Sequence, residues 1–174
     1  MEFVIASDIM ISLDDYPHIP YWYTLKEAVE IIEKSEIKVE GRKSLPRALL
    51  VFDEQNHLLG ILRRRDILRG LEPKFLRTMS IPQRKKLFDI EADLNLIDLF
   101  SGKINQAMRE QAKTPVSEVM VPVAATAEHD EPLAKIIYKM ITREMTLIPV
   151  MKDKKVVGVV RTVDVFHQIY IALQ

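Results

Sequence analysis

The pattern of apolar and polar residues along the chain occurs twice. Apolar residues recur at offsets i, i+3, i+4 and i+7 from Leu25 and again from Leu133, which is the spacing of one buried stripe on a helix. Two short apolar runs follow each helix, separated by a polar stretch of hairpin length. The runs are "ALLVF" and "LLGIL" in the first copy, and "LIPVM" and "VVGVV" in the second. With a last helix at "RRRDILRGL" and at "RTVDVFHQIYIAL", each copy is predicted as strand, helix, strand, strand, helix.

Local signals indicate where these elements begin and end. Thr24 and Glu27 have the spacing of a capping box at the start of the first helix, and Asp130 before Pro132 is expected to start its counterpart. Gly70 is placed to end the helix of "RRRDILRGL" as a C-terminal cap. The tetrapeptides "SDIM" and "SEVM" open the two copies, which supports an internal repeat.

The two copies differ in length. Met10 and Gly60 are 50 residues apart, whereas their counterparts Met120 and Gly158 are 38 residues apart. The twelve extra residues are expected mostly in "EIKVEGRKSLPR", a polar extension that precedes the first apolar run.

The segment between the copies does not repeat, but its leucines and isoleucines have roughly helical spacing. One or two connecting helices are expected there, because long loops without structure are uncommon in compact chains. The domain organisation is therefore predicted as a first repeat at 1–70, a helical linker at 71–114 and a second repeat at 115–174.

Composition narrows the class of protein. Apolar residues make up 48% of the 174 residues and charged residues 29%, as in globular proteins. There is no cysteine, which excludes disulfides, thiolate metal sites and cysteine nucleophiles. The longest clean apolar runs span five residues, whereas a membrane helix needs about 20. The N-terminus has no basic flank typical of a signal peptide, so a cytoplasmic protein is expected.

Charge is balanced overall but unevenly distributed. The chain has 25 basic and 25 acidic residues, so no net field attracts nucleic acid. Residues 63–86, however, carry nine basic and two acidic groups. This segment could follow a nucleic-acid backbone. Because no recognised nucleic-acid motif accompanies it, salt bridges across the linker or across a dimer are favoured.

No motif indicates catalysis or metal binding. The four histidines are scattered, and none is spaced with a carboxylate as in a metal site. Neither a nucleophile elbow nor a dinucleotide fingerprint occurs. The chain is therefore not expected to be an enzyme.

The paired motifs resemble those of tandem cystathionine-β-synthase (CBS) domain proteins, also called Bateman modules. The resemblance rests on "DIM" and "EVM", on "LIPVM", and on the pair "GILRRRDIL" and "GVVRTVDVF". It covers roughly residues 3–70 and 114–172. It implies an α/β fold of two βαββα repeats packed as an intramolecular pair and usually paired again into a dimer. Family members are sensors that commonly bind adenosine-containing ligands in clefts between the two repeats.

The resemblance also implies a ligand motif, in which glycine is followed by a serine or threonine that holds phosphate and by an aspartate that accepts hydrogen bonds from ribose. The matching glycines and aspartates are Gly60 and Asp66, and Gly158 and Asp164. The hydroxyl position is instead occupied by Arg63 and by Arg161. A guanidinium offers a fork of donors suited to a more anionic ligand. Alternatively, each arginine pairs with a local acid or covers the helix end.

The family's base pocket is formed by apolar residues of the clefts. The corresponding residues here are Ile11, Val121, Pro122, Ile148 and Pro149. They are either ligand contacts or ordinary core, and the sequence leaves both readings open. The two further arginines of "RRR", Arg64 and Arg65, have no counterpart in the second copy and are expected to be solvated.

The expected function is that of a stand-alone regulatory module that senses AMP, ADP, ATP or S-adenosylmethionine and signals by a conformational change. It needs no cofactor and no metal, forms a homodimer through its repeats, and acts on an effector protein that the sequence does not identify. Membrane and nucleic-acid partners are not expected. The alternatives are a ligand-free dimeric interaction scaffold and a nucleic-acid-binding protein that uses residues 63–86.

Overall fold

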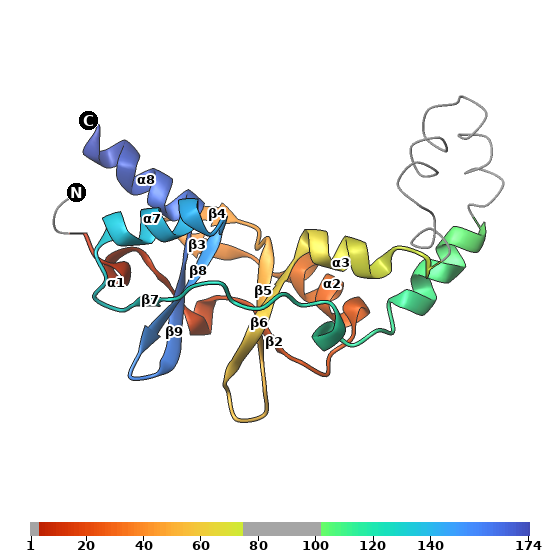
Figure 1. Ribbon diagram of the computed structural model, residues 1–174. Helices are drawn as coiled ribbons and strands as arrows, with labels where there is room; N and C mark the ends of the chain where they lie inside the picture. The colour runs from red at the N-terminus through yellow and green to blue at the C-terminus, as the bar shows by residue number, and fades with distance from the viewer. Residues whose placement is uncertain (1–3, 75–101) are drawn as a thin grey trace.

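The computed structural model describes residues 4–74 and 102–174, which form two α/β units side by side (Figure 1). Each unit is a small sheet with a pair of helices on it. The first unit contains β2 (His18–Pro20), α2 (Leu25–Lys34), β5 (Ala48–Phe52), β6 (Leu58–Arg63) and α3 (Arg64–Leu71). The second contains β7 (Ala127–Glu128), α7 (Leu133–Thr142), β8 (Leu147–Lys152), β9 (Lys155–Arg161) and α8 (Thr162–Ala172). The predicted order of elements is confirmed in both copies.

Strand pairing is the same in the two units. The first strand runs parallel to the second, and the second and third form an antiparallel hairpin, which gives the strand orders β2-β5-β6 and β9-β8-β7. The strands β5 and β8 are almost wholly buried because they are central in their sheets and carry continuous apolar runs. The apolar runs of the sequence therefore place the strands correctly.

The predicted capping box at α2 is present. The Glu27 backbone N–H donates to Thr24 Oγ1 at 3.3 Å, and the Thr24 N–H donates to Glu27 Oε2 at 2.7 Å. These two bonds satisfy donors that the first turn of a helix otherwise leaves unpaired. Leu25, Ala28 and Ile32 are buried against the sheet.

Two other predicted helix ends are wrong. Helix α7 has Pro132 at its N-cap, and no side chain, including that of Asp130, caps it. Gly70 lies inside the last turn of α3 rather than after it. A Cβ atom at Gly70 would lie 2.7 Å from Leu25 Cδ1, so this glycine permits α3 to pack closely on α2.

The two units exchange their leading segments. Helix α1 (Ala6–Ile9) packs in the core of the second unit, and β1 (Ile11–Ser12) pairs antiparallel with β9. In return, the 3₁₀ turn η2 (Val116–Glu118) packs in the core of the first unit. Figure 1 shows the red N-terminal segment beside the blue unit and the teal segment crossing back. Each unit therefore needs residues from both halves of the sequence to complete its core.

This exchange explains the glycines of the repeated motif. A Cβ atom at Gly60 would lie 2.7 Å from the Val121 carbonyl oxygen, and one at Gly158 would overlap the Ile11 carbonyl oxygen. The glycines thus allow close approach of the exchanged backbone. Between the units, side chains from both sheets form a shared core of Ile11, Tyr16, Ile37, Ala48, Leu50, Phe52, Ile61, Leu147 and Val159.

The extra segment of the first copy forms a small antiparallel hairpin. Strands β3 (Ile37–Val39) and β4 (Arg42–Ser44) are joined by Glu40 and Gly41, both with positive φ. Such a two-residue turn matches the right-handed twist of the strands it connects. The hairpin contributes Ile37 to the shared core, so it is part of the fold rather than a loose extension.

Residues 102–111 of the predicted linker are helical. The rest of the predicted linker helices, together with part of the basic segment 63–86, lies at residues 75–101, outside the described residues. The boundaries at 70/71 and 114/115 stay a prediction. Among the described residues, no helix has the length and apolar character needed to cross a bilayer.

Candidate functional site

The two repeated motifs form the same structure at the junction of a strand and a helix. Arg63 is the N-cap of α3, and Asp66 lies in the first turn of that helix. The Arg63 backbone N–H donates to Asp66 Oδ2 at 3.0 Å, while its Nε and Nη2 donate to Oδ2 and Oδ1 at 2.7 and 2.8 Å. A carboxylate in the first turn is also stabilised by the helix dipole. Arg63 therefore holds the Asp66 carboxylate in a bidentate pair.

The second motif repeats this arrangement at α8. Arg161 Nε and Nη2 donate to Asp164 at 2.8 and 2.7 Å, and the Arg161 backbone N–H donates to Asp164 at 3.2 Å. Of the two readings that the sequence leaves open for these arginines, the geometry shows pairing with the local acid. Both aspartates accept the donors of their own N-cap residue.

The electrostatics of the first pair favour its charged form. Burial by itself would raise the pKa of Asp66, but the hydrogen bonds from Arg63 and the charges of Arg63 and Arg69 hold that pKa below its ordinary value. Bidentate guanidinium–carboxylate pairs are among the stronger polar contacts in proteins. Asp66 therefore stays ionised at neutral pH.

The surroundings of the two pairs differ. The Arg63 side chain is 35% exposed, whereas that of Arg161 is only 12% exposed. Arg161 Nη1 donates to Ser44 Oγ at 2.8 Å, and Ser44 belongs to the β3–β4 hairpin of the first unit. For Arg63 Nη1, no such contact occurs within the described part of the chain. The guanidinium of the first pair is therefore partly open to solvent and that of the second is covered, while both carboxylates are buried.

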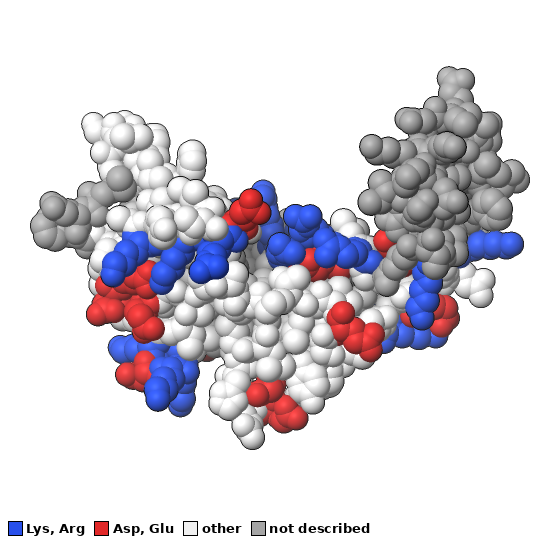
Figure 2. All heavy atoms as spheres, viewed as in Figure 1, with Lys and Arg blue, Asp and Glu red and all other residues white. Residues whose placement is uncertain are grey.

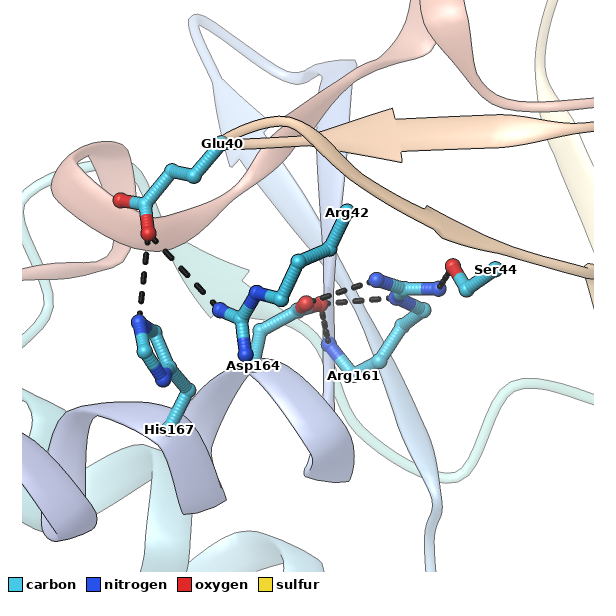
Figure 3. A network of polar contacts seen from close by, with 6 residues as sticks. All are labelled: Glu40, Arg42, Ser44, Arg161, Asp164 and His167. Atoms are coloured by element: carbon cyan, nitrogen blue, oxygen red, sulfur yellow. Dashed lines mark hydrogen bonds and ion pairs between the residues drawn. The ribbon is translucent and has the colours of Figure 1, made fainter.

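Figure 3 shows how the hairpin covers the second pair. Glu40, at the hairpin turn, lies 3.2 Å from His167 Nε2 on α8 and 3.8 Å from Arg42 Nη2. The contact with His167 connects the hairpin to α8 on the far side of Asp164 from Ser44, while the contact with Arg42 lies within the hairpin. The β3–β4 hairpin of the first unit therefore contacts residues on both sides of Asp164.

Apolar side chains fill the space beneath the hairpin. Tyr16 is 2% exposed, and its hydroxyl donates to the Ala48 carbonyl at 2.7 Å. Burial raises the pKa of Tyr16, so the phenol remains protonated. Ile37 is also fully buried there. Sequence reasoning missed Tyr16, Ile37 and Ser44, although the twelve extra residues of the first copy were the signal for the latter two.

The five predicted base-pocket residues do not lie together. Ile11 belongs to the shared core between the units and Val121 packs against it. Ile148 is buried in the core between the second sheet and its helices, because strand alternation turns it away from the first unit while Leu147 faces that unit. Pro149 is buried in β8, on the Leu147 side by alternation.

Pro122 lies elsewhere, in a cleft of about 960 Å³ between the turns of the β5–β6 and β8–β9 hairpins. The lining combines apolar residues such as Phe52 and Val156 with polar turn residues such as Lys154. Neither the motif arginines nor the motif aspartates line this cleft. It is separate from both motif sites.

The remaining candidates are the two further arginines of the first motif and a metal site. Arg64 and Arg65 are exposed in the first turn of α3, in agreement with their expected solvation. In residues 4–74 and 102–174, no group of three or more histidines, aspartates or glutamates is arranged to hold a metal ion.

Comparison with known proteins identifies the family. The CBS domain family model matches residues 6–73 and 116–170, which are most of the chain. No curated protein matches the sequence.

Solved structures with the same fold are distant in sequence. The CBS domain of a membrane protein from Sphaerobacter thermophilus is 21% identical, with a TM-score of 0.64 over 95% of this chain and 88% of that one. CBSX2 in complex with AMP is 14% identical, with a TM-score of 0.62 over 98% of each chain. The CBS domain pair of MJ0100, in complex with 5′-methylthioadenosine and S-adenosylmethionine, is 20% identical, with a TM-score of 0.60 over 99% of each chain.

At these identities the structures establish the fold, and the family match over both repeats agrees with it. The predicted α/β architecture of two βαββα repeats is confirmed. The chain belongs to the CBS domain family, as a tandem pair of CBS repeats.

Proposed function

We propose that this CBS pair is a regulatory module that binds an adenosine-containing nucleotide at the first motif site and signals by a change in the packing of its two units. The observation that carries the proposal is the Arg63–Asp66 pair at the start of α3, in which the guanidinium is 35% exposed and the carboxylate that it holds is buried. It combines a carboxylate suited to ribose hydroxyls with a guanidinium suited to phosphate.

Binding at this site requires the pair to open. Both oxygens of Asp66 already accept hydrogen bonds from Arg63, so ribose hydroxyls cannot donate to Asp66 without replacing them. A ligand phosphate provides the replacement partner for the guanidinium. As Arg63 turns from Asp66 to the phosphate, Asp66 becomes free to accept from ribose. We therefore expect the phosphate to contribute more to affinity here than in a site with a hydroxyl at position 63.

The relatives support this class of ligand. CBSX2 was solved with AMP, and the MJ0100 pair with 5′-methylthioadenosine and S-adenosylmethionine. We propose AMP, ADP or ATP ahead of S-adenosylmethionine, because a phosphate offers the Arg63 guanidinium more negative charge than the single carboxylate of S-adenosylmethionine does. Val121 and Pro149 are proposed as apolar contacts for the base, together with Ile11 and Leu147. Ile148 faces the core of its own unit and is left out.

The proposal has a conformational output rather than a catalytic one. Opening the Arg63–Asp66 pair loosens the N-cap of α3, and α3 is packed on α2 through Gly70. A ligand can shift the arrangement of the units only by the difference between its affinities for two states. A homodimer formed through the repeats and an effector protein that reads this state in the cytoplasm belong to the same proposal.

Thermal unfolding in the presence of AMP, ADP, ATP, S-adenosylmethionine and adenosine tests the proposal. A ligand at 100 times its dissociation constant adds about 2.7 kcal/mol to the stability of the folded state. We expect AMP to stabilise the wild type more than adenosine does. Asp66→Ala should abolish the shift, whereas Asp164→Ala, the matched change at the covered site, should preserve it. No shift with any ligand would reject nucleotide sensing.

Arg63→Thr sharpens this test, because it places the family's hydroxyl at the first site and releases Asp66. The variant should bind adenosine better than the wild type does, and the advantage of AMP over adenosine should shrink. An unchanged preference would show that Arg63 does not contact the phosphate.

A second candidate function is a ligand-free interaction scaffold. The specific observation in its favour is that both motif aspartates are paired and the second site is covered by the β3–β4 hairpin. It predicts no ligand-dependent shift and unchanged partner binding when Asp66 or Asp164 is replaced.

A further inference from the structure

The cleft of about 960 Å³ between the turns of the β5–β6 and β8–β9 hairpins is lined by equivalent positions of the two repeats. Strand register and distance from the repeated motifs match its apolar residues in pairs: Leu13 with Val123, Phe52 with Met151, and Leu58 with Val156. Strands β6 and β9 begin beside the cleft and end at the motif arginines. The cleft therefore lies between the repeats, at the end of the sheets opposite the motif sites (Figure 1).

The floor of the cleft is apolar and only partly covered. Leu13, Leu58, Val123 and Val156 pack against the shared core between the units, yet they are only partly buried. Leu59, at the side of the cleft, is 37% exposed. The volume falls within the range of about 300–1,000 Å³ that is usual for small-molecule sites, whose walls are mostly apolar with a few polar groups.

Polar groups on the side of the first repeat already have partners. Asp53 accepts hydrogen bonds from the backbone N–H groups of Gln55 and His57, both at 2.8 Å, and lies 3.0 Å from His57 Nδ1. His18 Nδ1 lies 2.9 Å from the Tyr16 carbonyl oxygen. This side therefore presents mainly amide and imidazole groups, and the carboxylate nearest to it is occupied.

The side of the second repeat is cationic. Asp153 and Lys154, with φ of 51° and 65°, form a tight turn between β8 and β9. Lys154 and Lys155 line the cleft and are exposed, and neither has an ion pair within the described part of the chain. Asp153 also lines the cleft, so two ammonium groups face it against one carboxylate. Figure 2 shows blue side chains at the β8–β9 turn and red and white ones at the β5–β6 turn.

We propose that this cleft binds a small amphipathic organic anion. Its aliphatic or aromatic body lies on the apolar floor, and its carboxylate or sulfonate head accepts charge-assisted hydrogen bonds from Lys154 and Lys155. The site goes beyond the proposed nucleotide site, because the motif arginines and aspartates are not among its lining residues. A molecule bound there contacts both repeats, since the floor residues come in pairs from the two.

The chemistry of the lining favours this class of ligand over two others. A cationic ligand would face Lys154 and Lys155. A nucleotide would bring phosphates, for which arginine provides the fitting fork of donors, but no arginine is among the described residues that line the cleft. An apolar floor with a cationic edge on one side suits a molecule with an apolar body and a single anionic end.

Fluorescence of anilinonaphthalene sulfonate, an apolar anion that reports apolar surface, tests the proposal on the full chain. We expect saturable binding of one molecule per chain and displacement by decanoate. Decyltrimethylammonium has the same chain length and the opposite charge, and displacement should need about ten times its concentration or more. Absence of saturable binding, or equal displacement by the two competitors, would overturn the proposal.

Charge reversal tests the cationic side. Lys154→Glu with Lys155→Glu should weaken binding of anilinonaphthalene sulfonate about 10-fold or more, because like charge then opposes the sulfonate. Lys38→Glu with Lys135→Glu is the matched control, since it changes the net charge equally at exposed positions outside the cleft, and it should bind like the wild type. Equal weakening in both variants would reduce the effect to net charge and reject the site.

Filling the cleft tests its location. Ala125→Trp places an indole among the lining residues and should abolish saturable binding of anilinonaphthalene sulfonate. Ala124→Trp is the matched control at the neighbouring exposed position, which does not line the cleft, and it should preserve binding. Binding that survives Ala125→Trp would place the probe elsewhere. AMP should leave the probe bound, and displacement by AMP that persists in Asp66→Ala would make the cleft a nucleotide site and overturn the proposal.

Discussion

The motif sites at Asp66 and Asp164 have the same arginine–aspartate geometry but different surroundings. At the first, Arg63 is one-third exposed and bonds only its own aspartate among the described residues. At the second, Arg161 is nearly buried and also donates to Ser44 of the β3–β4 hairpin (Figure 3). An internal repeat has thus produced two copies of one local structure, and an insertion in one copy has covered only one of them.

The comparison teaches that a shared motif does not imply a shared role. The arginine–aspartate pair is local, because its members are three residues apart, so both copies form it. Access to the pair is nonlocal, because it depends on residues of the other unit. We therefore propose ligand binding at the first site and a structural role in joining the units at the second. The following predictions test that division.

The largest effect is expected from removing the carboxylate that pairs with the covered arginine. Asp164→Ala leaves the buried Arg161 without its partner and should lower the free energy of unfolding by about 4 kcal/mol. Asp66→Ala is its matched control. It should lower the free energy of unfolding by about 2 kcal/mol, because the Arg63 guanidinium can form hydrogen bonds with water instead. Urea unfolding measures both. Equal losses would show that the hairpin does not isolate the second site.

Loosening the hairpin is expected to have the next largest effect. Ile37→Ala removes a fully buried side chain from the shared core and should cost about 3 kcal/mol. It should also increase proteolysis near Gly41, at the hairpin turn. Val29→Ala, on the exposed side of α2, is a control that should change stability by about 0.5 kcal/mol or less. Unchanged proteolysis in Ile37→Ala would indicate that polar contacts alone hold the hairpin.

A smaller loss is expected when the hydrogen bond between the units is removed. Ser44→Ala should cost about 1 kcal/mol. In a double-mutant cycle with Arg161→Met, the two losses should not add, since both changes remove the same bond. The combination of Ser44→Ala with Arg63→Met should be additive, because Ser44 has no contact with the first pair. Additivity in both cycles would contradict the bond between Ser44 and Arg161.

The smallest effect is the expected change in stability as the pH is lowered. The pKa of Asp66 is lower in the folded protein than the value of about 3.9 in an unfolded chain. The stability that this carboxylate contributes is therefore fully present above its unfolded pKa and lost as pH falls through its folded pKa. Asp66→Asn should be less stable than the wild type at neutral pH, and the difference should narrow below about pH 4. Urea unfolding across this range measures it, and a constant difference would disprove the linkage.

Much of the fold is determined by the sequence alone, because its signals are local. The apolar runs form the strands, the helix stripes face the sheets, and Thr24 and Glu27 cap α2 as their spacing requires. The hydrogen bonds that each motif aspartate accepts from its N-cap arginine are local in the same sense. Gly70 shows the limit of such signals, since its role depends on how closely α3 approaches α2.

Contacts between segments that are far apart in the sequence are decided only by the tertiary structure. The exchange of leading segments gives Gly60 and Gly158 their role, because the atoms that exclude a Cβ belong to residues more than 60 positions away. The hairpin that covers Asp164 comes from the other half of the chain, and the side of β8 that faces the first unit is set by strand pairing. Contacts between distant segments are established only when both sheets pack, so which site is open to a ligand is a property of the folded pair.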